Sequence, residues 1–138
     1  MKTIISKSPE ETYQFGVDFG RVLSAGDVVA LFGELGAGKT VLAQGICRGF
    51  GYRGDVTSPS FVRIHTYPYT IPIYHADFYL LRSDEEVIDL GLDELYGSDA
   101  LVIVEWAQRF PDMLPHRCHR IEIEWQGNGE NVRGIKIN

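Results

Sequence analysis

Residues 33–40 read Gly33-Glu34-Leu35-Gly36-Ala37-Gly38-Lys39-Thr40, and they decide how the rest of the chain is interpreted. They fit the pattern G-x-x-x-x-G-K-[ST], in which glycines allow the backbone to turn successive N–H groups toward one phosphate. The apolar run 28–32 precedes them, as expected of a strand buried on both faces, and residues 40–50 have the apolar spacing of a helix. We predict a phosphate-binding loop, here called the phosphate loop, between a buried strand and the positive end of a helix dipole.

Two side chains of the phosphate loop have expected chemical roles. Lys39 is a point charge for the β- and γ-phosphates, and the hydroxyl of Thr40 is a ligand for Mg²⁺. The alternative is a glycine-rich turn that binds nothing, but such a turn does not require three glycines, a lysine and a hydroxyl at these positions.

Two later strand-like stretches end in acids. The apolar stretch 100–105 ends at Glu105, which is followed by Trp106, and the stretch 71–77 ends at Asp77. Because ligands bind at the carboxyl ends of the strands in such sheets, we expect Asp77 and Glu105 beside the phosphate loop. Two carboxylates and the Thr40 hydroxyl suit an octahedral Mg²⁺ that keeps several waters. Each acid could instead be a structural cap.

Residues 55–61, here called the Ser-Pro segment, carry hydroxyl side chains on both sides of Pro59. The segment follows the helix 40–50 and precedes the next strand. In a nucleotide hydrolase, a segment at this place can order on the γ-phosphate and relax after hydrolysis. A plain surface loop is the alternative interpretation.

The other patterns predict an α/β fold in one domain, residues 1–138. Ser8 and Ser83 are expected to cap helices. Strands are expected at 2–6, 61–67, 71–77, 100–105, 121–125 and 132–137, with a linker at 111–115. Together they indicate a sheet of parallel core strands, typical of P-loop nucleotide hydrolases, with added antiparallel hairpins and flanking helices.

The bulk composition is that of a globular protein. The chain has 138 residues, of which 44% are hydrophobic and 23% charged, and its net charge is −6. This charge gives no attraction to nucleic acid, so if the protein acts on RNA, a partner is expected to hold the RNA. The amino terminus has no signal segment and no apolar run approaches the ~20 residues of a membrane span, which indicates a cytosolic protein. Cys47 and Cys118 are expected to be packed or idle thiols.

Further motifs follow the phosphate loop in a specific order. They are Thr57-Ser58-Pro59-Ser60-Phe61, His75-Ala76-Asp77-Phe78-Tyr79, Asp89-Leu90-Gly91-Leu92 and Val104-Glu105-Trp106. In this order the chain resembles the TsaE family, formerly the YjeE family, of small bacterial ATPases needed for threonylcarbamoyladenosine modification of tRNA. The resemblance implies ATP and Mg²⁺ as cofactors and the TsaB and TsaD proteins as partners. It also implies that TsaD carries the threonylcarbamoyl transfer, that ATP hydrolysis resets or promotes that cycle, and that tRNA is reached only through the complex, with no membrane involved.

The resemblance also assigns the site. It places Lys39 on the phosphates, Thr40 and Glu105 on Mg²⁺, and Asp77 on the γ-phosphate side, while Trp106 is expected in a moving segment. The expected nucleotide contacts include Gly36, Ala37, Gly38 and Val41, and Thr12 and Arg133 are similar to the family's remaining contacts. Two positions depart from the family: Ser60 replaces the usual Thr, and Leu80 replaces the usual Arg, for which Arg82 is the nearest substitute.

The sequence also bears on the rate of hydrolysis and on rival functions. No arginine lies within the phosphate loop or beside it in the sequence, and an arginine finger is worth ~10³ to 10⁵ in rate. We therefore expect slow hydrolysis by the isolated chain and faster hydrolysis in a complex, with Asp77 or Glu105 orienting the water. A small-molecule kinase is one alternative, but it would need an acceptor pocket and usually an arginine-rich lid. A GTP-dependent switch is another; guanine readers commonly carry Asn-Lys-x-Asp, and none of Asn128, Asn131 and Asn138 is followed by Lys, which favours adenine.

Overall fold

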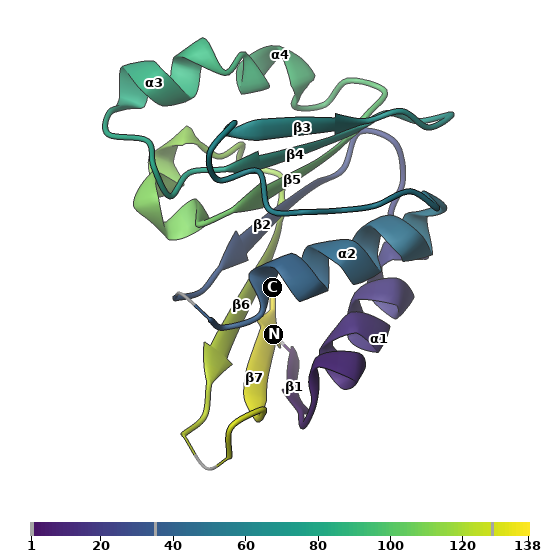
Figure 1. The fold of residues 1–138 in the computed structure, drawn as a ribbon. Coiled ribbons are helices and arrows are strands. Elements are labelled where there is room, and N and C mark those ends of the chain that lie inside the picture. Colours follow the sequence, from purple (N-terminus) through teal and green to yellow (C-terminus); the bar gives the residue numbers. More distant parts are fainter. Residues whose placement is uncertain (1, 35, 128) are drawn as a thin grey trace.

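The computed structural model describes residues 2–34, 36–127 and 129–138, which form a mixed sheet with helices on both faces (Figure 1). The strands are β1 (Lys2–Ser6), β2 (Val28–Phe32), β3 (Ile64–Tyr67), β4 (Ile73–Asp77), β5 (Leu101–Glu105), β6 (His119–Trp125) and β7 (Arg133–Ile137). The helices are α1 (Pro9–Gly20), α2 (Lys39–Phe50), α3 (Asp84–Asp89) and α4 (Leu92–Leu95), with 3₁₀ turns η1 (Ala107–Arg109) and η2 (Pro111–Met113). Leu35 of the phosphate loop and Asn128 of the last hairpin lie outside the described residues.

The strand order is β1-β7-β6-β2-β5-β4-β3. The four inner strands β6, β2, β5 and β4 run parallel, whereas β3 at one edge and β7 and β1 at the other pair antiparallel. This arrangement confirms the predicted α/β fold with parallel core strands and added antiparallel hairpins. Because β2, β4 and β5 are parallel, their carboxyl ends share one edge of the sheet, where Asp77 and Glu105 are register partners.

The two faces of the sheet have separate apolar cores. Val29 and Leu31 of β2 point to the face covered by α2, with Leu42 and Ile46. Their neighbours on β2 belong to the other core, which includes residues of α3 and α4. The first four residues of this central strand are buried, which explains why its sequence is an unbroken apolar run rather than an alternating one.

Helices α1 and α2 pack closely enough for their backbones to touch. A Cβ atom added to Gly16 would lie 2.6 Å from the carbonyl oxygen of Leu42 and 3.0 Å from the Cα of Gly45, and Gly45 itself has no room for a Cβ against the carbonyl of Tyr13. The glycines of this contact therefore let α1 approach α2, and the approach brings Thr12 of α1 next to the phosphate loop.

Both predicted helix caps are confirmed. The Ser8 hydroxyl accepts a hydrogen bond from the Glu11 N–H at 3.1 Å, and the Ser83 hydroxyl accepts one from the Glu86 N–H at 3.2 Å. The Glu11 carboxylate, expected to complete a capping box at Ser8, instead accepts the N–H of Lys7 at 3.1 Å. Each cap still satisfies a backbone donor that the first helical turn leaves free.

Two local predictions need correction, and one side chain departs from the alternation of its strand. The strand expected over 61–67 begins at Ile64, because Arg63 has a φ of 72° and breaks the extended conformation. The linker 111–115 contains the 3₁₀ turn η2. Trp125 alternates with the buried Ile121 and Ile123, yet it is 60% exposed near the carboxyl end of β6.

Among the described residues, no helix is both long and apolar enough to cross a membrane.

Candidate functional site

The phosphate loop joins the carboxyl end of β2 to the first residue of α2. Gly36 and Gly38 have φ values of 79° and 106°, which residues with a Cβ adopt only with strain. Gly38 is the N-cap of α2 and makes no side-chain capping bond to the helix. Because a glycine N-cap has no side chain to accept a hydrogen bond, the first N–H groups of α2 stay available as donors. An anion site at the amino terminus of a helix requires such available donors.

A pocket of about 350 Å³, here called the phosphate pocket, opens beside this loop. Its wall combines the loop, the Ser-Pro segment and the ends of β4 and β5, and its lining residues are Gly36, Gly38, Lys39, Thr40, Val41, Ser58, Ser60, Asp77, Glu105 and Trp106. The structure thus brings together the predicted phosphate ligands, the predicted metal ligands and both predicted acids.

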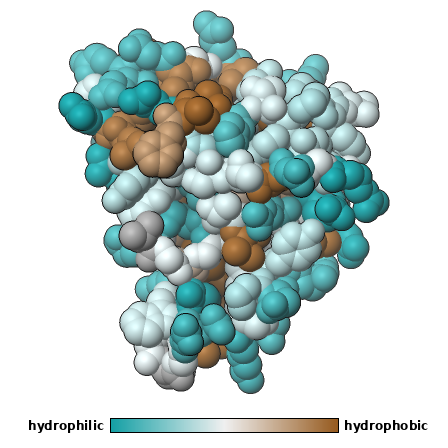
Figure 2. Space-filling model, viewed as in Figure 1, coloured by the Kyte–Doolittle hydropathy of each residue, from teal (hydrophilic) through white to brown (hydrophobic). Residues whose placement is uncertain are grey.

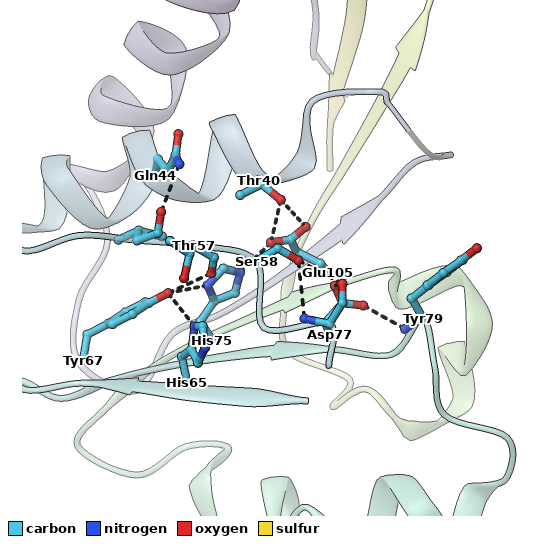
Figure 3. A network of polar contacts seen from close by, with 12 residues as sticks. Thr40, Gln44, Thr57, Ser58, His65, Tyr67, His75, Asp77, Tyr79 and Glu105 are labelled. Atoms are coloured by element: carbon cyan, nitrogen blue, oxygen red, sulfur yellow. Dashed lines mark hydrogen bonds and ion pairs between the residues drawn. The ribbon is translucent and has the colours of Figure 1, made fainter. Parts of the chain in front are cut away.

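Thr40 and Glu105 are already paired across the pocket (Figure 3). The Thr40 hydroxyl donates to Glu105 Oε1 at 3.1 Å, and Oε2 lies 3.4 Å away. A hydroxyl and a carboxylate are hard oxygen ligands of the kind Mg²⁺ prefers when it also binds phosphates and waters. Among the described residues, no three His, Cys, Asp or Glu side chains form a metal cage. The Thr40 hydroxyl and the Glu105 carboxylate fit a metal that also takes phosphate and water oxygens as ligands.

Asp77 lies next to Glu105 and is buried. Its Oδ2 accepts a hydrogen bond from the Ser60 hydroxyl and its Oδ1 accepts one from the Tyr79 N–H, both at 2.8 Å. Burial raises the pKa of Asp77, and the two hydrogen bonds oppose that rise. Ser60, which stands where the family usually has Thr, retains the hydroxyl that makes this contact.

Lys39 is folded against its own loop. Its Nζ donates to the carbonyl oxygens of Gly33 at 2.6 Å and Glu34 at 2.8 Å, and it lies 4.1 Å from the centre of the Trp106 ring. Burial lowers the pKa of Lys39, whereas the nearby charge of Glu105 acts in the opposite direction. A phosphate entering the pocket would compete with these carbonyls for the ammonium group.

Trp106 has a φ of 57°, the left-handed conformation that bulky residues rarely adopt. The centre of its ring lies 4.1 Å from Lys39 Nζ and 4.5 Å from the centre of the Tyr79 ring. A strained backbone directly after Glu105 therefore places an aromatic ring against the phosphate-binding lysine.

Gln108 of η1 contacts the phosphate loop, and no pattern in the sequence predicted this contact. Its Nε2 donates to the Gly33 carbonyl at 2.8 Å, and its Oε1 accepts from the Gly33 N–H at 3.3 Å. The amide side chain thus pairs with a backbone peptide as a neighbouring strand would. Such a contact depends on the path of the chain after β5, which no spacing rule predicts.

Thr12 and Arg133 lie outside the phosphate pocket but beside the same loop. A second pocket of about 140 Å³ is lined by Pro9, Thr12, Gly36, Ala37, Gly38, Val41, Asn131 and Arg133. Arg133 donates to the carbonyls of Ala37 at 2.9 Å and Gly36 at 3.0 Å, and Thr12 Oγ1 is 2.7 Å from Ser6 Oγ. No arginine neighbours the loop along the chain, but Arg133 lies beside the loop in the structure. Its guanidinium points to the loop carbonyls and does not line the phosphate pocket. The two pockets share Gly36, Gly38 and Val41, so a nucleotide lying across the loop would reach both.

A buried polar network continues behind Glu105 (Figure 3). Nε2 of His75 lies 2.6 Å from Glu105 Oε2, and its Nδ1 lies 2.9 Å from the Tyr67 hydroxyl. The Tyr67 hydroxyl also donates to the Thr57 carbonyl of the Ser-Pro segment at 3.2 Å. The sequence identified His75 only as a member of a family motif and Tyr67 only as a strand residue, because their meeting depends on the pairing of β3 with β4 and of β4 with β5.

Among the described residues, no arginine lines the phosphate pocket, and Leu80 stands where the family usually has one. Leu80 is partly exposed, Arg82 is exposed, and neither lines the pocket. In this structure Arg82 therefore does not take the place of the family arginine.

Comparisons with known proteins show the family to which the chain is similar. A family model described as "Threonylcarbamoyl adenosine biosynthesis protein TsaE" matches residues 6–135. Two proteins named tRNA threonylcarbamoyladenosine biosynthesis protein TsaE are similar to the chain. The one from Treponema pallidum is 34% identical over 91% of this chain and 93% of its own length, and the one from Bacillus subtilis is 38% identical over 89% and 77%.

The fold has a solved counterpart as well. The crystal structure of Bacillus subtilis YdiB superposes with a TM-score of 0.81 at 30% identity, covering 99% of this chain and 83% of that one. The family match, the relatives and the structural similarity all extend over most of the chain. The chain therefore belongs to the TsaE family of tRNA threonylcarbamoyladenosine biosynthesis proteins.

Proposed function

We propose that this chain binds and hydrolyses ATP as a subunit of the bacterial tRNA threonylcarbamoyladenosine machinery, acting with the TsaB and TsaD proteins. The observation that carries the proposal is the shared lining of the phosphate pocket by Lys39, Thr40, Asp77 and Glu105. These four side chains come from three segments that are far apart in the sequence. A structural turn would not require a lysine, a hydroxyl and two acids to converge on one open pocket.

In the proposed complex, the triphosphate lies over the phosphate loop. Backbone N–H groups from Gly36 to Val41 and the ammonium of Lys39 bind its oxygens. The adenosine end lies toward the second pocket, near Thr12 and Arg133. Thr40 and Glu105, together with phosphate oxygens, would hold Mg²⁺, which would supply positive charge against the phosphates.

The acids position the attacking water. Asp77 and Glu105 are adjacent at the strand ends, and one of their carboxylates orients a water molecule toward the γ-phosphorus. The water oxygen forms a bond to phosphorus as the bond to the β,γ-bridging oxygen breaks, so the products are ADP and inorganic phosphate. The reaction depends on positioning and on charge, and no covalent intermediate with the protein is needed.

Turnover is proposed to be slow in the isolated chain and faster in the complex. Among the described residues that line the phosphate pocket there is no arginine. Arg133, the arginine that contacts the loop, donates to backbone carbonyls instead of entering that pocket. The missing positive charge is therefore expected to come from a partner or from a rearrangement that a partner induces.

The surface around the pocket fits a protein partner. Phe61 and Val62, which directly follow the pocket residue Ser60, are 89% and 60% exposed, and Leu80 is partly exposed three residues after Asp77. In Figure 2, hydrophobic atoms gather at the corner of the molecule where Figure 1 shows α3. We propose that TsaB and TsaD cover exposed hydrophobic residues next to the pocket, in the cytoplasm, and that tRNA is reached only through them, in keeping with the net charge of −6.

The test is ATP hydrolysis by the purified chain, alone and with TsaB and TsaD, for the native protein and for Lys39→Ala. We expect slow phosphate release that requires Mg²⁺, stimulation by the partners, and loss of both in the variant. Full activity that is indifferent to partners would contradict the partner role, and no hydrolysis in any mixture would contradict the enzyme assignment. Phosphate appearing on a nucleoside or other small acceptor would instead indicate a kinase, and stronger competition by GTP than by ATP would indicate a guanine nucleotide switch.

A further inference from the structure

We propose that Tyr67 and His75 are positioning residues that connect the Ser-Pro segment to Glu105. Because the same segment also contacts Asp77, the orientation of both carboxylates depends on where the segment lies. The inference rests on the proposed function, because it concerns the acid assigned to Mg²⁺. It assigns a role to two buried side chains that do not reach the phosphate pocket themselves.

The connection is a continuous chain of short contacts (Figure 3). Starting at the Ser-Pro segment, the Thr57 carbonyl accepts from the Tyr67 hydroxyl at 3.2 Å. The same hydroxyl lies 2.9 Å from His75 Nδ1, and His75 Nε2 lies 2.6 Å from Glu105 Oε2. The side chains come from β3, β4 and β5, three adjacent strands, so the sheet itself fixes their spacing.

The hydrogen-bonding roles follow from the chemistry of the groups. A carboxylate only accepts, so His75 donates to Glu105 through Nε2. Burial raises the pKa of Tyr67 well above its ordinary value, so the phenol keeps its single proton. That proton has three acceptors in reach: His75 Nδ1 at 2.9 Å, the Thr57 carbonyl at 3.2 Å and His65 Nδ1 at 3.4 Å. Moving Thr57 away would remove one of these acceptors and would change how the hydroxyl holds the His75 imidazole against Glu105.

Burial makes the connection effective. His75, Glu105 and Tyr67 are all buried, with exposures of 0%, 2% and 6%. In such surroundings a polar group that loses its partner is not compensated by solvent, so the members of the chain constrain one another's orientation. Groups that orient a metal ligand in this way usually affect the metal affinity although they do not touch the metal.

The second acid is connected to the same segment directly. Ser60 donates to Asp77 at 2.8 Å, and Ser58 and Ser60 are 2.9 Å apart at their hydroxyl oxygens. Both serines line the phosphate pocket, where the γ-phosphate is proposed to lie. A segment drawn toward that phosphate would therefore move Ser60, the partner of Asp77, together with Thr57, the far end of the contacts that lead to Glu105.

The chain offers a matched pair of variants for a test. Tyr67→Phe removes the hydroxyl of the connection and keeps the aromatic ring, which stacks on Tyr52 with 5.1 Å between ring centres. Tyr52→Phe removes the hydroxyl of the other ring in the same stack and leaves the connection intact. Nucleotide binding by the full-length chain is measured with a fluorescent ATP analogue, first in EDTA and then across a Mg²⁺ titration.

We expect Tyr67→Phe to need about 10-fold more Mg²⁺ for half of the magnesium effect, the lower end of the range for groups that orient metal ligands. Its binding in EDTA should match the native chain, and Tyr52→Phe should match it in both conditions. His75→Gln should raise the Mg²⁺ requirement at least as much, and the double variant should be no worse than His75→Gln, because both changes break one chain of contacts.

Three results would overturn the inference. Equal Mg²⁺ requirements for Tyr67→Phe and Tyr52→Phe would show that the hydroxyl does not act on Glu105. A loss of the same size in EDTA and in Mg²⁺ would indicate a purely structural role, and additive losses in the double variant would show that the two residues act independently. If the native chain itself bound the analogue without any response to Mg²⁺, the proposed function would fail first and the inference with it.

Discussion

The pairing of Thr40 with Glu105 gives a prediction whose size follows from the structure. Thr40→Val keeps the shape of the side chain and removes the hydroxyl that donates to Glu105 Oε1 at 3.1 Å. A hydrogen bond to a charged group contributes ~1.5–3 kcal/mol to stability. The lower end applies here, because the bond is long and because Glu105 keeps a second donor, His75, at 2.6 Å.

Without nucleotide or metal, the free energy of unfolding of Thr40→Val should therefore fall by about 1.5 kcal/mol, which lowers the melting temperature by ~5 °C for a chain of this size. With nucleotide, the variant also lacks one ligand of the proposed Mg²⁺ site. The Mg²⁺ concentration for half of the magnesium effect on ATP binding should then rise by at least about 10-fold, equivalent to 1.4 kcal/mol.

The matched control is Thr40→Ser, which loses a methyl group and keeps the hydroxyl. Urea or thermal unfolding gives the first quantity, and a Mg²⁺ titration of ATP binding gives the second. We expect the serine variant to stay within ~0.5 kcal/mol of the native chain in its magnesium response. If valine and serine gave the same magnesium response, the assignment of Thr40 as a metal ligand would be refuted, whatever happened to stability.

Three further predictions use other parts of the site and its frame. Burial raises the pKa of Asp77 above its ordinary 3.8, so the folded chain keeps a proton that the unfolded chain has released, and the free energy of unfolding falls as the pH rises from about 3.8 through the folded pKa. Measured by urea unfolding at a series of pH values, the stability of Asp77→Asn relative to the native chain should therefore increase over that window. A relative stability that decreases would contradict the raised pKa. Gly45→Ala places a Cβ against the Tyr13 carbonyl and 3.0 Å from the Gly16 Cα, so it should destabilise the chain by ~1–3 kcal/mol in denaturant unfolding, and an unchanged midpoint would mean that α1 and α2 are not this close. Trp125→Phe leaves Trp106 as the remaining one of the chain's two tryptophans, so nucleotide binding should change the tryptophan fluorescence as Lys39 moves away from the Trp106 ring. The nucleotide concentration that saturates the site is determined by calorimetry, and a constant fluorescence at that concentration would refute the movement.

The sequence predicted the fold well, because its strongest patterns are local. The apolar run of β2, the glycines of the phosphate loop and the serine caps of α1 and α3 each act through neighbouring residues, and the structure has all of them. The boundary of β3 was wrong because Arg63 adopts a positive φ that no spacing rule anticipates.

The site was predictable only where strand ends and loop patterns determine it. Asp77 and Glu105 come together because parallel strands align their carboxyl ends, so two short patterns were enough. Gln108 and Tyr67 are connected to site residues through pairings and turns that are set by the whole fold, so their contacts could not be read from the sequence by itself. Arg133 was expected near the nucleotide only from the family resemblance, and its hydrogen bonds to the loop carbonyls depend on a partner that is distant along the chain.

The most direct test of the central claim is a crystal structure of the native chain with Mg²⁺ and a non-hydrolysable ATP analogue. The account predicts the triphosphate on the N–H groups of residues 36–41 and the metal within ~2.1 Å of the Thr40 hydroxyl oxygen, with Glu105 in its coordination shell directly or through water. A nucleotide bound elsewhere, or a metal distant from both Thr40 and Glu105, would contradict it.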